Sequence, residues 1–316
     1  MFKISQMDSK DIDQAMDLWY SSHQLYTGEG ILPDFLPGGK KILENYFLDR
    51  IKNESAVIIK DKNNILGYFS WISFNFHNEK SAFCPIIGHF GVETCKVQIY
   101  TELYKIVSTE WVKNGIFNHL WMINNKDNFL KKFSYDLGFG SYVMDAYIKN
   151  GFMEDAHGEY KITRATQDDC DSIFELTEES RRYYLASPVF LKRNEIEKAE
   201  IEQFIKNDAV FLAWDNNDII GLMSIGIEDE YNFEQLCTPE TASIDRLGAY
   251  IKPNYRGKGI GKSLLKSVFQ YCEDKKIEYI HVCFETANTY ANGFWPKYFT
   301  PIISSVRRTV NKDANL

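Results

Sequence analysis

The stretch SIDRLGAYIKPNYRGKGIGKSLLKSVFQYCED, residues 243–274, decides the fold because it places a strand, a glycine-rich turn and a helix in direct succession. Apolar residues over 244–251 predict the strand, and Pro253 ends its hydrogen-bond ladder. The order R-G-K-G-I-G follows at 256–261. The apolar residues after it recur at the helical period and predict a helix that begins near Gly261. These residues are Leu264, Leu265, Val268, Phe269 and Cys272.

This succession is typical of a site that binds an anion. The N-terminal N–H groups and the dipole of the helix attract a phosphate, and glycines let the backbone approach it closely. Arg256, Lys258 and Lys262 add positive charge. A Walker A loop is excluded because Arg256 stands where its first glycine would be, and the order G-x-G-x-G does not match the dinucleotide pattern G-x-G-x-x-G.

The chain also repeats itself. FKISQMDSKDIDQAMDL at 2–18 is similar to YKITRATQDDCDSIFEL at 160–176. AVIIKDKNNILGYFSWI at 56–72 is similar to AVFLAWDNNDIIGLMSIGI at 209–227, and both segments predict hairpins. Two copies of about 150 residues predict two similar domains, at 1–150 and 159–316. Strands that alternate with amphipathic helices predict an α/β (α+β) fold with two similar mixed β-sheets flanked by helices.

Composition restricts the partners. Lys plus Arg number 36 and Asp plus Glu number 44, so the net charge of −8 disfavours nucleic acid and suits a cationic small substrate. The 6 cysteines form no C-x-x-C pair, and no His pair has metal-ligand spacing, so we expect reduced thiols, no metal site and a cytoplasmic location. We expect Cys283 to be a buried structural thiol. No secretory signal or membrane-spanning stretch is predicted.

The motifs of the second copy resemble those of the GNAT superfamily of N-acetyltransferases. The pyrophosphate loop of that superfamily, [RQ]-x-x-G-x-[GA], is matched by Arg256-x-x-Gly259-x-Gly261, and its V-x-P is matched at 251–253. A later N-x-x-A-x-x-φ-Y block is matched at 288–295 in Asn, Ala and the apolar position, with Trp295 in the place of the Tyr. The resemblance covers about residues 160–310 and implies a tandem acyl-CoA N-acyltransferase fold.

The resemblance implies that acetyl-CoA lies in an opening between the strands 244–251 and 279–284. The pantetheine arm would pair with the first strand, where a backbone N–H would polarise the thioester. The loop would hold the pyrophosphate, and Asn288 would contact the pantetheine or its amide. The implied cofactor-binding residues are Ala249, Tyr250, Ile251, Arg256, Gly257, Lys258, Gly259, Ile260, Gly261, Lys262, Asn288 and Trp295.

Transfer to an amine needs a base for the ammonium proton, and an acid can assist the CoA thiolate. The acid of the family is usually the Tyr that Trp295 replaces here, so Tyr298 is the candidate, and an acid is dispensable because a thiolate leaves readily. Glu285, Asp245 and Glu228 stand at strand ends as candidate bases, and each is equally well explained as a solvated carboxylate. We expect His281, within an apolar run, to be a core histidine.

The first copy lacks the glycine-rich loop. GVETCKVQIYTELYKIV at 91–107 has no glycine after Gly91, and its bulky and acidic residues would oppose a pyrophosphate. We expect a degenerate domain without acetyl-CoA. Its helix face is predicted to be Val97, Tyr100, Leu103, Tyr104 and Val107.

The sequence therefore predicts an N-acetyltransferase (EC 2.3.1.-) that moves an acetyl group from acetyl-CoA to a primary amine of a small molecule by direct attack in a ternary complex. A non-catalytic acyl-CoA sensor, a longer acyl donor and an aminoacyl-tRNA donor remain as alternatives, the last opposed by the acidic charge. The acceptor, the acyl length and the choice between monomer and homodimer are left open.

Overall fold

The computed structural model describes residues 3–27, 30–151 and 160–314. The chain divides into two compact units. Unit 1 consists of Met1–Asp145, Tyr231–Leu236 and Pro301–Leu316, and unit 2 consists of Ala146–Glu230 and Cys237–Thr300.

Unit 1 is built from an antiparallel sheet in the order β1-β2-β3-β6 and from strands β4, β5, β7 and β15, which pair in that order. Its strands are β1 (Lys3–Gln6), β2 (Ala56–Asp61), β3 (Asn64–Ser70), β4 (Ile72–Phe76), β5 (Glu79–Cys84), β6 (His89–Gly91), β7 (Asn118–Asn124) and β15 (Thr300–Thr309). Its helices are α1 (Ile12–Thr27), α2 (Phe35–Lys52), α3 (Lys96–Lys113) and α4 (Asn128–Asp136). Strands β5 and β7 are parallel, and the other pairs are antiparallel.

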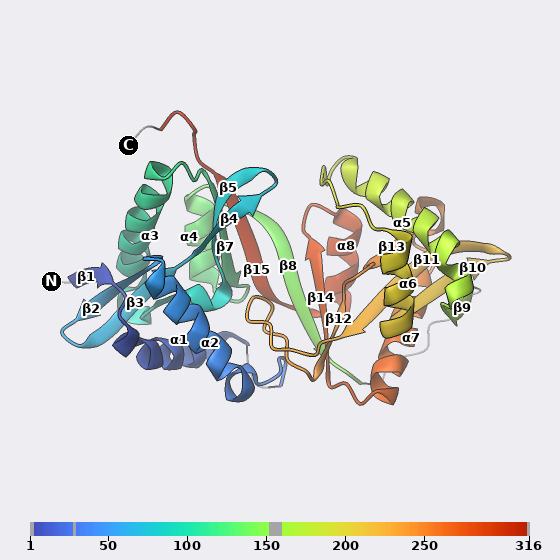
Figure 1. The fold of residues 1–316 in the computed structure, drawn as a ribbon, viewed down its shortest axis with the longest axis horizontal. Coiled ribbons are helices and arrows are strands. Elements are labelled where there is room, and N and C mark those ends of the chain that lie inside the picture. The colour runs from blue at the N-terminus through green and yellow to red at the C-terminus, as the bar shows by residue number, and fades with distance from the viewer. Residues whose placement is uncertain (1–2, 28–29, 152–159, 315–316) are drawn as a thin grey trace. The chain divides into compact units, whose positions relative to one another are not determined.

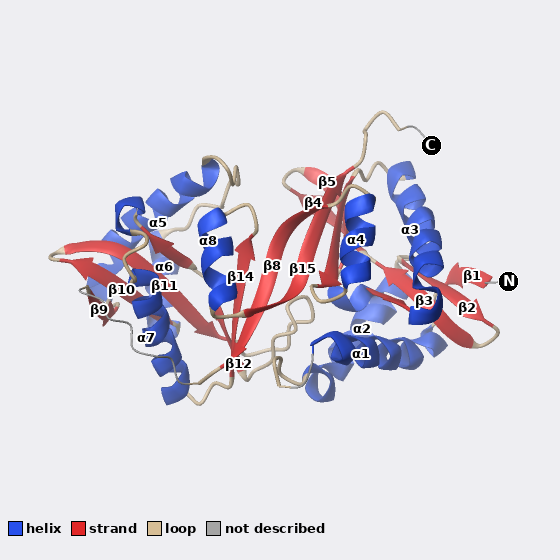
Figure 2. Cartoon of the chain, turned by 180° about the vertical axis from the view of Figure 1, so that it is seen from behind, coloured by secondary structure: helices blue, strands red, loops and turns tan. Residues whose placement is uncertain are grey.

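Unit 2 has the same plan. Strands β9, β10, β11 and β13 pair in antiparallel fashion, β12 continues from β11, and β12 and β14 are parallel. Its strands are β9 (Lys161–Arg164), β10 (Ala209–Asp215), β11 (Asp218–Ile227), β12 (Thr241–Ile244), β13 (Ala249–Ile251) and β14 (Tyr279–Glu285). Its helices are α5 (Cys170–Leu185), α6 (Lys198–Asn207), α7 (Ile260–Asp274) and α8 (Thr289–Phe294). Figures 1 and 2 show these helices beside the strands.

Helices cover both faces of the unit 2 sheet. Val210 and Leu212 of β10 pack in one core cluster with residues of α5 and α6. Phe211 lies between them in sequence and contacts Tyr271 of α7 instead, with ring centroids 6.3 Å apart. Because alternate residues of a strand face opposite sides, α5 and α6 cover one face and α7 covers the other. The predicted apolar face of α7 is confirmed, since all of its members are buried.

The two units confirm the predicted fold class, two similar mixed β-sheets flanked by helices. The hairpins β2–β3 and β10–β11 both shift register near their turns, after Ile59 and after Ala213. In both units the third strand of the antiparallel sheet then leads to a parallel pair, β5 with β7 and β12 with β14. The sequence repeat is therefore a repeat of strand order as well as of residues.

The two units differ from the predicted ranges 1–150 and 159–316. The C-terminal segment Pro301–Leu316 belongs to unit 1, because β15 pairs with β7 along residues 303–309. Strand β8 (Gly140–Lys149) passes from unit 1 to unit 2 at Ala146. Each half of the sequence thus gives a strand segment to the other unit, which an internal repeat cannot reveal. Most of the stretch between the two predicted ranges, residues 152–158, lies outside the described residues.

Helix α3 departs from its predicted apolar face at one position. Tyr100, Leu103, Tyr104 and Val107 are buried as expected. Val97, in the first turn of α3, is 62% exposed. Ile99 is fully buried in the core of unit 1 and takes part in that face instead.

In unit 1, buried polar contacts connect β6 to β7 and to α3. His89 of β6 lies 2.8 Å from Met122 O of β7 through Nε2 and 2.8 Å from Tyr100 Oη of α3 through Nδ1. Burial lowers the pKa of His89 to about 3, so the ring is neutral. Nε2–H therefore donates to the carbonyl, and Nδ1 accepts from the tyrosine. At the start of α3, Lys96 is buried and pairs with Asp127 at 2.7 Å.

These buried histidines make unit 1 sensitive to acid. Burial also lowers the pKa values of His23 and His119, each to about 4. A histidine whose pKa is lower in the folded than in the unfolded state stabilises the fold at pH values above its unfolded-state pKa, near 6.5. This stabilisation is lost as the pH falls toward the folded-state pKa.

We expect the free energy of unfolding to fall between pH 7 and pH 5, by about 1 kcal/mol per pH unit for each such histidine. His89→Gln should make this dependence shallower in urea unfolding at several pH values. His77→Gln, at an exposed histidine of the same unit, is the control and should leave the slope unchanged. An unchanged slope in His89→Gln would contradict the role given to burial.

Candidate active site

The site of unit 2 begins where two parallel strands separate. Strands β12 and β14 pair up to Ile244 and Val282. Beyond this point β13 pairs with β11 alone in the described part of the chain. Between β12 and β13 the backbone is left-handed at Arg246, with φ 49°, and at Gly248, with φ 67°. The predicted single strand 244–251 is therefore wrong: it is two short strands joined by a bulge that turns β13 away from β14.

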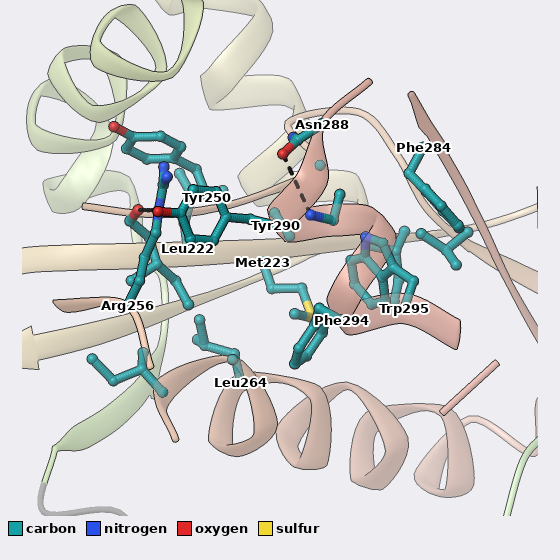
Figure 3. Close-up of a pocket in the computed structure, with 18 of the residues that line it drawn as sticks. Leu222, Met223, Tyr250, Arg256, Leu264, Phe284, Asn288, Tyr290, Phe294 and Trp295 are labelled. Carbon is teal, nitrogen blue, oxygen red and sulfur yellow. Dashed lines mark hydrogen bonds between the residues drawn. The ribbon is translucent and has the colours of Figure 1, made fainter. Parts of the chain in front are cut away.

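A cavity of about 330 Å³ lies at this separation. Its walls come from β13, the end of β14, the glycine-rich loop and helices α5, α7 and α8 (Figure 3). Every predicted cofactor-binding residue except Lys258 lines it, namely Ala249, Tyr250, Ile251, Arg256, Gly257, Gly259, Ile260, Gly261, Lys262, Asn288 and Trp295. Since α5 and α7 cover opposite faces of the sheet, the cavity reaches both faces through the gap in the strands.

The glycine-rich loop has the backbone that glycine alone adopts readily. Gly257 and Gly259 have φ of 74° and 82°, and no atom lies within 4 Å of a Cβ built on either. Gly259 caps α7, no side chain caps this end, and the helix begins at Ile260. The first N–H groups of α7 thus face the loop without an intrahelical partner. A Cβ on Gly261 would lie 3.1 Å from the Phe294 ring, so this glycine allows α8 to pack on α7.

Lys258 is directed elsewhere. Its Nζ lies 5.0 Å from the centre of the Tyr255 ring, and the Tyr255 hydroxyl donates to Asp215 at 2.9 Å. Its positive charge still lies within the loop and adds to the field at the N-terminus of α7.

Asn288 holds the wall of the cavity together. Its Oδ1 caps α8 by accepting from Ala291 N at 3.3 Å, and it also accepts from the Tyr183 hydroxyl at 3.1 Å. Its Nδ2 donates to the Tyr184 hydroxyl at 3.3 Å. The amide therefore joins α5 to α8, which is a structural role beside the predicted contact with pantetheine.

The end of the cavity beside α8 is aromatic. Trp295 is buried and contacts Phe294 and Phe299, with ring centroids 4.9 Å and 5.5 Å apart. Tyr298 lines the cavity, is partly buried and lies 5.1 Å from Phe294. Of the candidate acid and bases named from the sequence, Tyr298 alone lines the cavity.

Glu285 ends β14 just outside the lining and pairs with Arg193 at 3.3 Å. Arg193 comes from the segment between α5 and α6, lies over the Tyr184 ring at 3.6 Å and lines the cavity. Sequence analysis missed Arg193 and Tyr184. No spacing pattern marks them, because Arg193 and Glu285 are 92 residues apart in the sequence and come together only in the folded chain.

Asp245 lies in the bulge and does not line the cavity. Arg246 Nη1 pairs with its Oδ2 at 3.0 Å, whereas its buried Oδ1 has no hydrogen-bond partner among the described residues. Burial raises the pKa of Asp245 to about 6, opposed by Arg246 and reinforced by Glu228. The structure thus separates Asp245 from Tyr298 and the cavity.

Two further predictions concern β12 and β14. His281 is fully buried as expected, with Nδ1 3.2 Å from the Ser243 hydroxyl and its ring 4.8 Å from that of Tyr147. The same hydroxyl donates to Glu228. Cys283 was predicted to be buried, and this is wrong: it is exposed and lines the cavity, because β14 has lost its partner strand at this point.

Comparisons with known proteins agree with this geometry. Residues 170–299 match the model of the acetyltransferase (GNAT) family. A GCN5-related N-acetyltransferase from Sphaerobacter thermophilus is 12% identical, with a TM-score of 0.63, and the match covers 98% of this chain and 95% of that one. The glucosamine N-acetyltransferase region of a fungal multi-domain GH3 β-N-acetylglucosaminidase is 11% identical, with a TM-score of 0.55, and covers 97% of this chain and 38% of that one. No curated protein matches the sequence significantly.

Split parallel strands with a glycine-rich helix N-terminus beside them define an acyltransferase. Residues 170–299 are similar over their whole length to an acetyltransferase (GNAT) domain. Within residues 3–27, 30–151 and 160–314, every helix is too short or too polar to span a membrane.

The raised pKa of Asp245 gives a test of the site's electrostatics. An acid whose folded pKa lies above its unfolded value stabilises the fold below the unfolded value, near 3.8, and loses that contribution as the pH rises through about 6. We therefore expect the free energy of unfolding of Asp245→Asn at pH 8, measured in urea, to exceed that of the wild type by about 1–2 kcal/mol. The difference should be smaller at pH 4. Asp229→Asn, at an exposed carboxylate of unit 2, is the control. Equal stabilities of Asp245→Asn and the wild type at pH 8 would contradict the assignment.

Proposed function

We propose that the protein transfers the acetyl group of acetyl-CoA to a primary amine of a small molecule, by direct attack within a ternary complex. One observation carries the proposal: a single cavity joins the glycine-rich loop to the gap between β13 and β14. A phosphate-bearing cosubstrate held at the loop can therefore extend its arm along β13.

The residues present fit this cosubstrate. Strand β13 pairs on one side with β11 and, in the described chain, has no strand on its other side. The N–H and C=O groups of that edge can pair with an extended pantetheine arm, as they would with an added strand. The loop glycines leave open space beside the N-terminus of α7, which suits a pyrophosphate.

When bound, acetyl-CoA supplies a thioester whose C–S bond breaks as the amine nitrogen forms a C–N bond, so that CoA leaves as a thiolate and the amine gives up one proton. A backbone N–H of β13 polarises the carbonyl as negative charge develops on its oxygen. Tyr298, which lines the cavity, donates a proton to the thiolate. Glu285, which ends β14 just outside the lining of the cavity, accepts the amine proton through a water.

Unit 1 does not take part in cofactor binding in this proposal. Its corresponding gap, between β6 and β7, is crossed by His89, and the start of α3 carries the Lys96–Asp127 pair in place of a glycine-rich loop. The cavity beside these contacts has a volume of about 30 Å³, against about 330 Å³ in unit 2, which is too small for a pantetheine arm.

A glutamate in the loop should prevent cofactor binding. Gly259→Glu places a negative side chain beside the expected pyrophosphate, so we expect the affinity for acetyl-CoA to fall at least 100-fold in calorimetric titration. Gly115→Glu is the matched control, because Gly115 also has a left-handed φ, 72°, with no atom within 4 Å of its Cβ. The control bears the same backbone strain and should bind acetyl-CoA as the wild type does.

The titration is followed by a thiol-release assay with a panel of amines. Three outcomes distinguish the proposed function from its alternatives. Absence of binding to the wild type, or equal binding by Gly259→Glu, would overturn the cofactor assignment. Binding without release for every amine would favour an acyl-CoA sensor. Faster release from longer acyl-CoA donors would revise the acyl group and leave the site in place.

The proposed base can be separated from a structural role by its pH profile. Glu285→Gln should lower kcat about 100-fold and flatten the rise of kcat with pH, because the amine then loses its assisted proton transfer. A structural role through Arg193 would raise KM and keep the profile. Glu202→Gln, at an exposed carboxylate of α6, should leave both unchanged. An unaltered pH profile in Glu285→Gln would remove Glu285 as the base.

A further inference from the structure

Three tyrosine rings surround the guanidinium of Arg256. Its Cζ lies 4.3 Å from the ring centre of Tyr183, 4.6 Å from that of Tyr290 and 5.6 Å from that of Tyr250. The rings come from three separate elements, α5, α8 and β13. Figure 3 shows Arg256 beside the rings of Tyr250 and Tyr290. Distances below about 6 Å between a cation and ring centres are those of cation–π attraction.

A carboxylate stands behind these rings. The Tyr250 hydroxyl donates to Glu179 Oε1 of α5 at 3.1 Å. Burial and the neighbouring Glu179 raise the pKa of Tyr250 above its usual range, so the phenol keeps its proton. Tyr183, Tyr250 and Tyr290 with Glu179, hereafter the tyrosine cage, thus offer three electron-rich ring faces and one negative charge. This is the chemistry that recognises an organic cation.

Arg256, which lies within the tyrosine cage, also blocks the free edge of β13. Arg256 Nε donates to Ile251 O at 3.0 Å. That carbonyl belongs to the short strand along which the proposed pantetheine arm would pair. Arg256 lies next to the glycine-rich loop, so a pyrophosphate at the loop provides a second, negatively charged partner for its guanidinium. Binding of the cosubstrate and residence of Arg256 in the cage therefore compete.

We propose that the tyrosine cage is the binding site for a second cationic group of the acceptor, and that Arg256 fills it until acetyl-CoA binds. This inference rests on the proposed function and deepens it. The acceptor is then a small amine that carries another positive charge, such as a diamine. Cosubstrate and acceptor bind in that order, because the cage opens when Arg256 moves to the pyrophosphate. The acidic net charge of −8 favours the same class of acceptor.

The first test compares two acceptors of equal length in a thiol-release assay with acetyl-CoA. 1,4-Diaminobutane carries a second ammonium where 4-aminobutan-1-ol carries a hydroxyl. We expect kcat/KM to favour the diamine at least tenfold in the wild type. Tyr290→Leu should reduce this preference about fivefold through KM, whereas Tyr290→Phe, which keeps the ring, should retain it. Tyr290 is 61% exposed, so its replacement leaves the core intact.

Tyr135→Leu is the matched control, because Tyr135 is 76% exposed on α4, the helix of unit 1 that corresponds to α8. It should keep the full preference for the diamine. Equal kcat/KM for the two acceptors in the wild type, or an unchanged preference in Tyr290→Leu, would overturn the inference while the acetyltransferase proposal stands.

The second test needs no turnover. By calorimetry without acetyl-CoA, the wild type should not bind 1,4-diaminobutane, and Arg256→Gln, which empties the cage, should bind it. Addition of CoA should bring about diamine binding in the wild type. Failure of Arg256→Gln to bind the diamine would overturn the cage as a cation site. Diamine binding by this variant in a protein that releases no thiol with any amine would keep the cage and overturn the proposed function.

Discussion

The active site depends on the bulge that separates β13 from β14, and one buried serine holds that bulge. Ser224 of β11 donates its backbone N–H to Gly248 O at 2.8 Å. Its hydroxyl donates to Asp245 O at 2.5 Å and accepts from Leu247 N at 3.1 Å. These contacts satisfy backbone groups that a continuous parallel pair would have satisfied, and they do so where water is excluded. Without them the left-handed turn at Gly248 would leave several polar groups buried and unpaired, each at a cost of about 1–3 kcal/mol.

In unit 1 the corresponding serine binds the backbone where the strands separate. Ser70 of β3 donates to Gly88 O at 3.0 Å, in the turn that leads into β6. The strand separation is therefore common to both units, and what fills it differs. In unit 1, His89 and Tyr100 bridge the gap with neutral hydrogen bonds. In unit 2, glycines at the helix start and a three-residue β13 leave a cavity of about 330 Å³. A few side chains thus separate a closed core from a binding site.

The sequence predicted what local patterns encode. The period of Leu264 to Cys272 marked α7, the repeated hairpins marked the duplicated sheets, and the glycines marked the loop at the mouth of the cavity. It did not predict what depends on distant pairing. Strand β15 belongs to unit 1 because it pairs with β7. Cys283 is exposed because β14 extends beyond the end of its partner strand, β12. Arg193 reaches Glu285 through the segment between α5 and α6, where no period applies.

The same limit explains the position of Arg256. As a sequence letter it is the first residue of a phosphate loop, and its charge alone predicts an anion as its partner. In the structure its guanidinium instead lies against three tyrosine rings, and its Nε holds the carbonyl of Ile251. A cation–π contact is worth about 0.5–2 kcal/mol, little enough for a pyrophosphate to overcome with charge-assisted hydrogen bonds. The arrangement therefore keeps the edge of β13 occupied in the ligand-free protein and gives it up to a ligand that offers a stronger partner.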